Sequence, residues 1–292
     1  MKNKEKGILF SILSRSLSIS PVLIRLSLYT INPETTNMLQ TLFSSVMFVL
    51  LFIVLRKTNN FKNIIKNWKG PAIIGLLAFV ASLLYTYGIL LAGPTTASFV
   101  IQFATIFTIF LGIAFLKERF TKLEGFGVLL AVIGLLVMSY ENIEIQYLSI
   151  IVILGGSLII AVENIFSKKF LKNENPITLA GGRSMFMFLF FFVFSVLSGR
   201  LQTNLTMASL GYTFLAAVTG IFLNFILSFK SLKLIEVSKS VAVGTIGPFF
   251  VTIYSFIILS LIPTINQLLG GILIIIGIIS LSLIRKKQQI RA

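Results

Sequence analysis

The chain has 292 residues, of which 56% are hydrophobic and only 12% are charged, and its mean hydropathy is +0.98. A water-soluble protein of this size has about a quarter charged residues, so this composition excludes a soluble fold and places most of the chain in lipid. The 25 Lys and Arg residues exceed the 9 Glu, and there is no Asp, His or Cys. These counts exclude disulfides, Cys-ligated metals and the usual catalytic triads and dyads, and we expect no metal and no cofactor.

Apolar stretches of about 20 residues, the length that an α-helix needs to cross a bilayer, follow one another from the N-terminus. The first begins behind Lys2, Lys4 and Lys6, and it is too long for the apolar core of a secretory signal. The stretches are continuous rather than alternating, which favours helices over the strands of a barrel. We predict ten spans, at 7–29, 36–55, 71–92, 95–116, 123–140, 147–167, 177–198, 209–229, 239–261 and 265–284.

The positions of the basic residues predict how the spans are oriented. If the N-terminus is inside, the inside segments are 1–6, 56–70, 117–122, 168–176, 230–239 and 285–292. These segments contain every Lys and Arg outside the spans except Arg200. Cytoplasmic loops of membrane proteins carry such an excess of basic residues, so we predict that the N- and C-termini are both cytoplasmic. Because the basic residues cluster between spans, the net charge of +16 does not indicate a nucleic-acid partner.

A repeat with an offset of 143 residues relates the two halves of the chain without a gap. The matching features are Asn32-Pro33 with Asn175-Pro176, Phe107 with Phe250, Thr121 with Thr264, Gly127 with Gly270, and Gly134 with Gly277. Five spans per half is an odd number, so the two halves must have opposite orientations in the membrane. We therefore predict an all-α integral membrane protein of two inverted five-helix repeats, residues 1–143 and 144–292. Transporters often have this design, with the substrate near the midplane between the repeats.

Several short motifs are similar to those of a known transporter family. They are the Asn32-Pro33 turn, Leu116-Lys117-Glu118-Arg119, Thr121 followed by Gly127 and Gly134, and Gly247-Pro248. Over its whole length the chain resembles the drug/metabolite transporter superfamily, of the ten-helix type with two EamA-like halves. The resemblance implies a cavity lined by the first four spans and the sixth to ninth spans, with the fifth and tenth at the periphery.

The chain also departs from that family pattern. Ser14-Arg15-Ser16 stands where many members have Trp-Gly, and Thr105 stands where many have Pro. The departures leave the predicted fold intact and weaken any inference about the substrate.

Arg15 is the most informative polar residue inside a predicted span. It lies about 13 Å into the first span at 1.5 Å per residue, near the membrane midplane, and Ser14 and Ser18 are close to it in sequence. A charged side chain at that depth costs about 2.5–3.5 kcal/mol and normally faces a cavity or a partner. Its guanidinium is suited to hold a carboxylate or phosphate of a substrate. The alternatives are a buried structural ion pair and a side chain that reaches into a water-filled cavity.

Glu163 is the one acidic residue well inside a span. It suits a proton-coupling site, because burial raises the pKa of a carboxyl group and a nearby arginine lowers it. It also suits an ion pair with Arg15 or with Arg183, which has a similar depth in the seventh span. We favour a structural Glu163–Arg183 pair.

Other polar residues of the spans are candidates for the wall of a cavity. Tyr85 and Gln102 are predicted at one level of the membrane, and Asn164 and Asn224 are hydrogen-bonding candidates. For each of them an interhelical hydrogen bond is the alternative role. Arg25 lies near the outer end of its span, where its long side chain can reach the interface. Pro21 and Pro248 predict kinks in the middle of helices, which suit hinges of an alternating-access carrier.

These features favour a secondary active transporter of a small metabolite, such as an amino acid or an organic acid. The chain lacks a GxxxxGK[ST] loop for ATP, so direct coupling to ATP within this chain is not expected. We expect alternating access, with export or exchange as the mode. Two alternatives remain: a multidrug or cation efflux transporter that uses Glu163, and a membrane scaffold that transports nothing. An intramembrane enzyme is not expected.

The partners that we expect follow from the transporter interpretation. They are a small-molecule substrate, membrane lipid, and a coupling proton or counter-substrate. We predict a monomer or homodimer that crosses the plasma or inner cell membrane several times.

Overall fold

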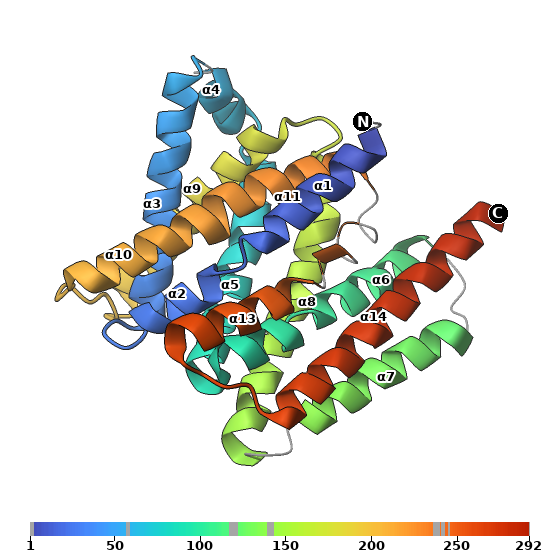
Figure 1. The fold of residues 1–292 in the computed structure, drawn as a ribbon. Coiled ribbons are helices and arrows are strands. Elements are labelled where there is room, and N and C mark those ends of the chain that lie inside the picture. The colour runs from blue at the N-terminus through green and yellow to red at the C-terminus, as the bar shows by residue number, and fades with distance from the viewer. Residues whose placement is uncertain are drawn as a thin grey trace.

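A computed structural model describes residues 3–56, 59–116, 122–138, 143–235, 240, 243–244 and 246–291. These residues form a helical bundle without a β-strand (Figure 1). In chain order the helices are α1 (Asn3–Ser16), α2 (Ser20–Ser27), α3 (Pro33–Val54), α4 (Asn59–Lys66), α5 (Lys69–Val100), α6 (Phe103–Leu116), α7 (Lys122–Met138), α8 (Ile143–Phe170), α9 (Pro176–Leu197), α10 (Met207–Ala216), the π-helix η1 (Ala217–Leu223), α11 (Asn224–Leu234), α13 (Gly247–Leu259) and α14 (Ile265–Arg291).

Six helical stretches of the described chain are long and apolar enough to cross a membrane. They are Glu5–Ser27, Pro33–Val54, Lys69–Val100, Tyr147–Phe170, Pro176–Leu197 and Met207–Leu234. Shorter apolar helices are Phe126–Met138, Gly247–Leu259 and Ile265–Ser280. Many large apolar side chains of these helices are exposed, which is expected where lipid is the solvent. The prediction of an all-α membrane fold is confirmed, and the cytoplasmic location of the termini remains a prediction.

Helices begin inside three of the predicted spans. The first span breaks between Ser16 and Ser20, and the fourth breaks at Ile101–Gln102. In the ninth, α13 begins at Gly247, after a turn at Ile246. Adding 143 to the end of α6, Leu116, gives Leu259, which is the end of α13. The breaks before α6 and α13 therefore occupy matching places in the repeat.

The prolines begin helices rather than kink them. Pro21 and Pro248 lie in the first turns of α2 and α13, where the missing N–H removes no intrahelical hydrogen bond. The prediction that these two prolines kink the middle of a helix is thus wrong, because a new helix starts at each of them. Gly93, with a φ of 78°, separates the two arms of α5 at the loop predicted between the third and fourth spans.

The two Asn-Pro motifs start corresponding helices of the two halves. Asn32 Oδ1 accepts a hydrogen bond from Thr35 N at 2.9 Å at the beginning of α3. Asn175 Oδ1 accepts one from Ile177 N at 2.9 Å at the beginning of α9. An N-cap side chain satisfies one of the unpaired N–H groups of a first turn, and Pro fits the next position. This explains why the motif recurs at the same place in the repeat.

The helices α7 and α14 pack against each other at the edge of the bundle (Figure 1). A Cβ atom on Gly134 would lie 2.6 Å from Gly270 O, and one on Gly277 would meet Gly127 O. Residue numbers rise along one helix as they fall along the other, so the helices are antiparallel. The repeat-related glycines therefore allow a close and symmetric crossing of two helices. As the resemblance implied, the fifth and tenth spans are peripheral.

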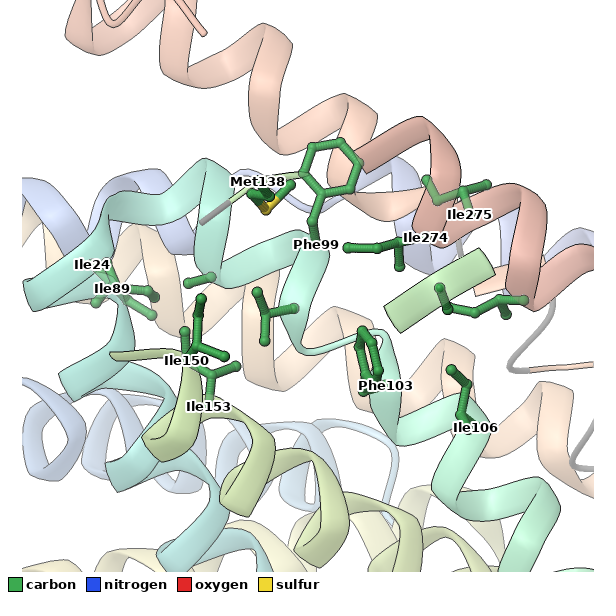
Figure 2. Close-up of a cluster of buried hydrophobic side chains, with 14 of the residues drawn as sticks. Ile24, Ile89, Phe99, Phe103, Ile106, Met138, Ile150, Ile153, Ile274 and Ile275 are labelled. Carbon is green, nitrogen blue, oxygen red and sulfur yellow. The ribbon is translucent and has the colours of Figure 1, made fainter. Parts of the chain in front are cut away.

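A cluster of buried side chains anchors this pair to the rest of the bundle (Figure 2). Phe99, from the second arm of α5, is fully buried and packs against Gly271 of α14. Ile153 of α8 and Ile89 of α5 belong to the same cluster, so it joins both halves of the chain.

One polar cluster ties the loop before α10 to the start of α3 and to the interior of α5. Arg200 Nη1 donates to Glu34 Oε1 and to Tyr87 Oη, both at 2.7 Å, and Tyr87 Oη donates to Glu34 Oε1 at 2.6 Å. Asn32 Nδ2 donates to Arg200 O at 2.6 Å. The buried carboxylate of Glu34 therefore has two donors, from the other half of the chain and from α5.

Four motif residues and one short helix lie between the predicted spans. Lys117, Glu118, Arg119 and Thr121, which support the family resemblance, lie outside the described residues. The short helix α4 was not predicted, because its eight residues lie in a basic segment between spans.

Candidate functional site: a cavity between the two halves

A cavity of about 290 Å³ lies inside the bundle. Residues of α1, α2, α3, α5, α6, α8, α9, η1, α11 and α13 line it, and none of the described residues of α7 or α14 does. These helices correspond to the first four and the sixth to ninth predicted spans, as the resemblance implied. The volume is near the lower end of the range of about 300–1,000 Å³ that is typical of small-molecule sites.

Three helices begin at this cavity. Ser20 of α2, Thr105 of α6 and Pro248 of α13 lie in first turns and line it. A first turn carries N–H groups without intrahelical partners and the positive end of the helix dipole, so it favours an anion. The breaks before α2 and α6 also end α1 and α5 at the cavity, so they place partial charges of both signs at its wall, in contrast to a continuous helix.

Arg15 lines the cavity from the last turn of α1. No hydrogen bond or ion pair joins its guanidinium to any described residue, and its Nε atom is buried without a partner. A Cβ atom on Gly244 would lie 3.0 Å from Arg15 Nε, so the guanidinium packs closely against the segment that leads into α13. The described titratable group that acts on it electrostatically is Tyr85, a phenol that is neutral at pH 7.

The charge of Arg15 is only partly compensated within the described chain. The carbonyl end of α1 favours a cation by about 0.3–1 kcal/mol, and by about 2 kcal/mol in the best partly buried cases. Arg15 is partly buried, and full removal of a charged group from water costs several kcal/mol per ion, so the helix end offsets only part of the cost of burial. An anion that entered the cavity would supply the missing interaction.

Glu163 and Arg183 form an ion pair in the same cavity. Arg183 Nε donates to Glu163 Oε1 at 2.7 Å, and the two side chains are only 4% and 8% exposed, with Arg183 the more buried. The guanidinium carbon lies 3.6 Å from the centre of the Phe225 ring, and Nη1 lies 3.0 Å from Met187 Sδ. The Glu163–Arg183 pair, which we favoured because the two residues have a similar depth in their spans, is therefore present. The alternative pair between Glu163 and Arg15 is not formed.

Ser14 and Asn224 hold two helices together. Asn224 Nδ2 donates to Ser14 O at 3.0 Å, and Ser228 Oγ donates to Asn224 Oδ1 at 3.1 Å. Ser14 Oγ lies 2.9 Å from Ser228 Oγ. Ser14 is buried in the contact of α1 with α11 and does not line the cavity, whereas Asn224 does. The interhelical alternative thus describes the contacts of Asn224, which also lines the cavity, and Ser14, which was expected beside the substrate, lies in the helix contact instead.

The remaining predicted site residues come together at the cavity. Ser18, Tyr85, Gln102 and Asn164 all line it, from α1–α2, α5, the break before α6, and α8. Gln102 Nε2 also donates to Ser98 O at 3.4 Å. The prediction that Tyr85 and Gln102 share one cavity is thus consistent with their positions.

Arg25 lies away from the cavity wall. Its Nη1 donates to Ile89 O at 3.3 Å and to Leu90 O at 2.6 Å, and its guanidinium lies 5.4 Å from the centre of the Tyr29 ring. It joins α2 to the end of the first arm of α5.

Sequence reasoning missed two amides on α3. Asn37 and Gln40 line the cavity one turn apart, on one face of the helix. Asn37 Nδ2 donates to Pro33 O at 2.8 Å, and its Oδ1 accepts from Thr86 Oγ1 at 3.2 Å. Gln40 is only 3% exposed, and its Nε2 has no hydrogen-bond partner. The spacing of two amides within an apolar span is the signal that could have identified them.

Comparisons with known proteins agree with this architecture. The family model described as EamA-like transporter family matches the chain twice, at residues 5–140 and 147–283. A solved crystal structure of a protein with 14% sequence identity has the same fold, with a TM-score of 0.73 over 98% of this chain and 99% of that one.

Curated relatives carry transporter names. The uncharacterized transporter YyaM of Bacillus subtilis is 25% identical over 251 residues, which are 82% of this chain and 80% of the relative. An uncharacterized transporter of Archaeoglobus fulgidus is 26% identical over 160 residues. That match covers 53% of this chain and spans 55% of the relative, about half its length. The names and the family model indicate a transporter rather than an enzyme.

Proposed function

Since the chain belongs to the EamA-like transporter family and is a multi-pass protein of the cell membrane, we propose that it carries a small anionic or zwitterionic metabolite by alternating access. The observation that carries this proposal is the uncompensated guanidinium of Arg15 in a cavity between the two halves. The first turns of three helices at the same cavity also favour an anion. Inverted-repeat transporters bind substrates in this way, at broken helices near the midplane.

The helix breaks also support alternating access as the mechanism. The breaks before α6 and α13 are related by the repeat, so equivalent joints lie in the two halves. Hinges are a few element-terminal residues that absorb changes in φ and ψ while rigid parts move. Movement at these joints would expose the cavity to one side of the membrane and then to the other. Export or exchange is the mode that we propose.

A cationic drug is a weaker candidate for the substrate. It would need a carboxylate in the cavity, and Glu163 already accepts a hydrogen bond from Arg183 at 2.7 Å. A lipophilic cation would also meet the positive charge of Arg15. We therefore rank two candidate roles of the cavity, proton coupling through Glu163 and cation efflux, below anion transport.

The test is thermal stabilisation of the detergent-purified protein by amino acids, organic acids, sugar phosphates and cationic drugs, for wild type and Arg15→Ala. We expect a saturable stabilisation by anionic or zwitterionic compounds that the folded variant loses. Compounds that stabilise wild type are then tested for saturable flux and countertransport in liposomes. Stabilisation by cationic drugs alone, or stabilisation that Arg15→Ala leaves unchanged, would contradict the anion site. A protein that binds but shows no flux would instead be a scaffold.

A further inference from the structure

The formal charges of the lining side chains determine which net charge on a ligand the cavity can neutralise. Three charged side chains line it, Arg15, Arg183 and Glu163, and the last two cancel in their ion pair. One positive charge therefore remains among the described lining residues. A monoanion brings the total to zero, whereas a zwitterion leaves it at plus one and a dianion takes it to minus one. An uncompensated charge away from water is unfavourable, so the cavity matches a monoanion.

An ammonium group would find one carboxylate among the described lining residues, and that carboxylate is already paired. Glu163 Oε1 is 2.7 Å from Arg183 Nε, and the Glu163 side chain is only 8% exposed. One face of the Arg183 guanidinium is covered by Phe225. An ammonium at the other oxygen of Glu163 would share one negative charge with Arg183, so two buried cations would have a single counter-charge. The cavity therefore disfavours amino acids.

Gln40 provides a second recognition element. Its neighbour on the same face, Asn37, is satisfied within the protein by Pro33 and Thr86. The Gln40 side chain is buried at the cavity with its Nε2 donor unpartnered. A buried donor without an acceptor is unfavourable, so a ligand oxygen that accepts from Gln40 would be stabilised. That oxygen has to be uncharged, because Arg15 already matches the one negative charge.

We propose that the substrate is a small monocarboxylate with an uncharged oxygen substituent, a hydroxy or oxo acid rather than an amino acid. This assignment depends on the proposed function, because it specifies the substrate class of the same cavity. The carboxylate pairs with Arg15, and the hydroxyl or carbonyl oxygen accepts a hydrogen bond from Gln40. The cavity of about 290 Å³ suits a molecule of this size.

The experiment uses matched acids that differ only at one substituent. Propanoate is compared with its 2-hydroxy, 2-oxo and 2-amino derivatives, and the same four forms of 4-methylpentanoate provide a larger series. Dissociation constants come from thermal stabilisation of the full chain, and counterflow in liposomes confirms transport. The variants are Arg15→Gln, Gln40→Met and Gln40→Leu, with Arg25→Gln as the control because it removes another arginine of the first span that lies outside the cavity.

In wild type we expect the hydroxy or oxo acid to bind about tenfold tighter than the unsubstituted acid, and the amino acid to bind weakest. Both Gln40 variants should abolish the preference for the oxygen substituent and leave the affinity for the unsubstituted acid within about twofold. Arg15→Gln should weaken every acid by about 100-fold. Arg25→Gln should leave all these ratios unchanged. Gln40→Met is nearly isosteric, so the test survives if the leucine variant does not fold.

The outcomes separate this inference from the proposed function. Amino acids that bind as tightly as hydroxy acids and depend on Arg15 would overturn the inference and leave the proposed transporter intact. The same holds if neither series binds while another anion binds through Arg15. A preference for oxygen that persists in both Gln40 variants would also overturn the inference. If no anion or zwitterion depends on Arg15, both the inference and the anion site of the proposed function fail.

Discussion

Two arginines face the same cavity in opposite states. Arg183 donates to Glu163, lies against Phe225 and contacts Met187, so its guanidinium has protein partners on several sides. The guanidinium of Arg15, at the end of α1, has no hydrogen bond to any described residue and lies at the carbonyl end of its own helix. The same side chain therefore has an internal partner at one place and needs an external one at the other.

The difference shows how a buried charge can be assigned a role. A paired charge that loses its partner destabilises the fold, because the partner remains buried and unpaired. A charge without a protein partner can be removed with little harm to the fold, but the ligand that it binds is lost. Stability and binding measurements on matched variants therefore separate the two roles.

The largest effect on stability is expected for Arg183→Leu. It leaves Glu163 buried without its partner, so we expect a loss of about 3–5 kcal/mol in the free energy of unfolding, measured by denaturant unfolding in detergent. The double variant Arg183→Leu with Glu163→Leu should lose less than Arg183→Leu alone. If the double variant loses the sum of the two single losses, the pair is not coupled and the comparison fails.

Arg15→Lys is expected to affect binding and not stability. Lysine keeps the charge but lacks the planar fork, so one charge-assisted hydrogen bond to a carboxylate is lost. Affinity for the substrate anion should fall about tenfold, less than with Arg15→Ala, while the melting temperature stays near that of wild type. A large drop in melting temperature would show that Arg15 has a structural role like that of Arg183.

Asn224→Ala tests a residue with both roles. It removes hydrogen bonds to Ser14 and Ser228 between α11 and α1. Such bonds contribute about 0.6 kcal/mol on average in membrane proteins, so a small loss of stability is expected in thermal unfolding. Ser14→Ala is the matched control, because it removes the contact of Ser14 Oγ with Ser228 Oγ between the same two helices, and Ser14 does not line the cavity. An effect on substrate affinity in Asn224→Ala alone would assign Asn224 to the binding site.

The smallest effect is expected for Arg200→Ala. Arg200 is 58% exposed, and Tyr87 continues to donate to Glu34 at 2.6 Å when Arg200 is removed. The hydrogen bond to Glu34 raises the pKa of Arg200 above its ordinary value and lowers that of Glu34, so the contribution of the pair is fully present at neutral pH and is lost at strongly alkaline pH or once Glu34 is protonated at acidic pH. Thermal unfolding with and without salt should show a small loss that salt reduces. A loss as large as that of Arg183→Leu would contradict this ranking.

Much of the fold followed from local features of the sequence. Continuous apolar stretches predicted the membrane helices, and the offset of 143 placed Asn32-Pro33 and Asn175-Pro176 at corresponding helix starts. The helix breaks at Leu17–Ile19 and Ile101–Gln102 were not predicted. Hydropathy averages over a whole span, so it does not detect a few residues that leave the helix inside the protein.

The sequence by itself determined that the chain lies in the membrane as helices, because lipid requires apolar side chains and internally satisfied backbone groups along each span. It also brought Glu163 and Arg183 to a common depth. Only the tertiary structure decided that these two pair, that Arg15 remains without a partner among the described residues, and that Gln40 joins it at the cavity. The physical reason is that pairing depends on how helices distant in sequence cross and where they break, and neither is encoded in the composition of a single span.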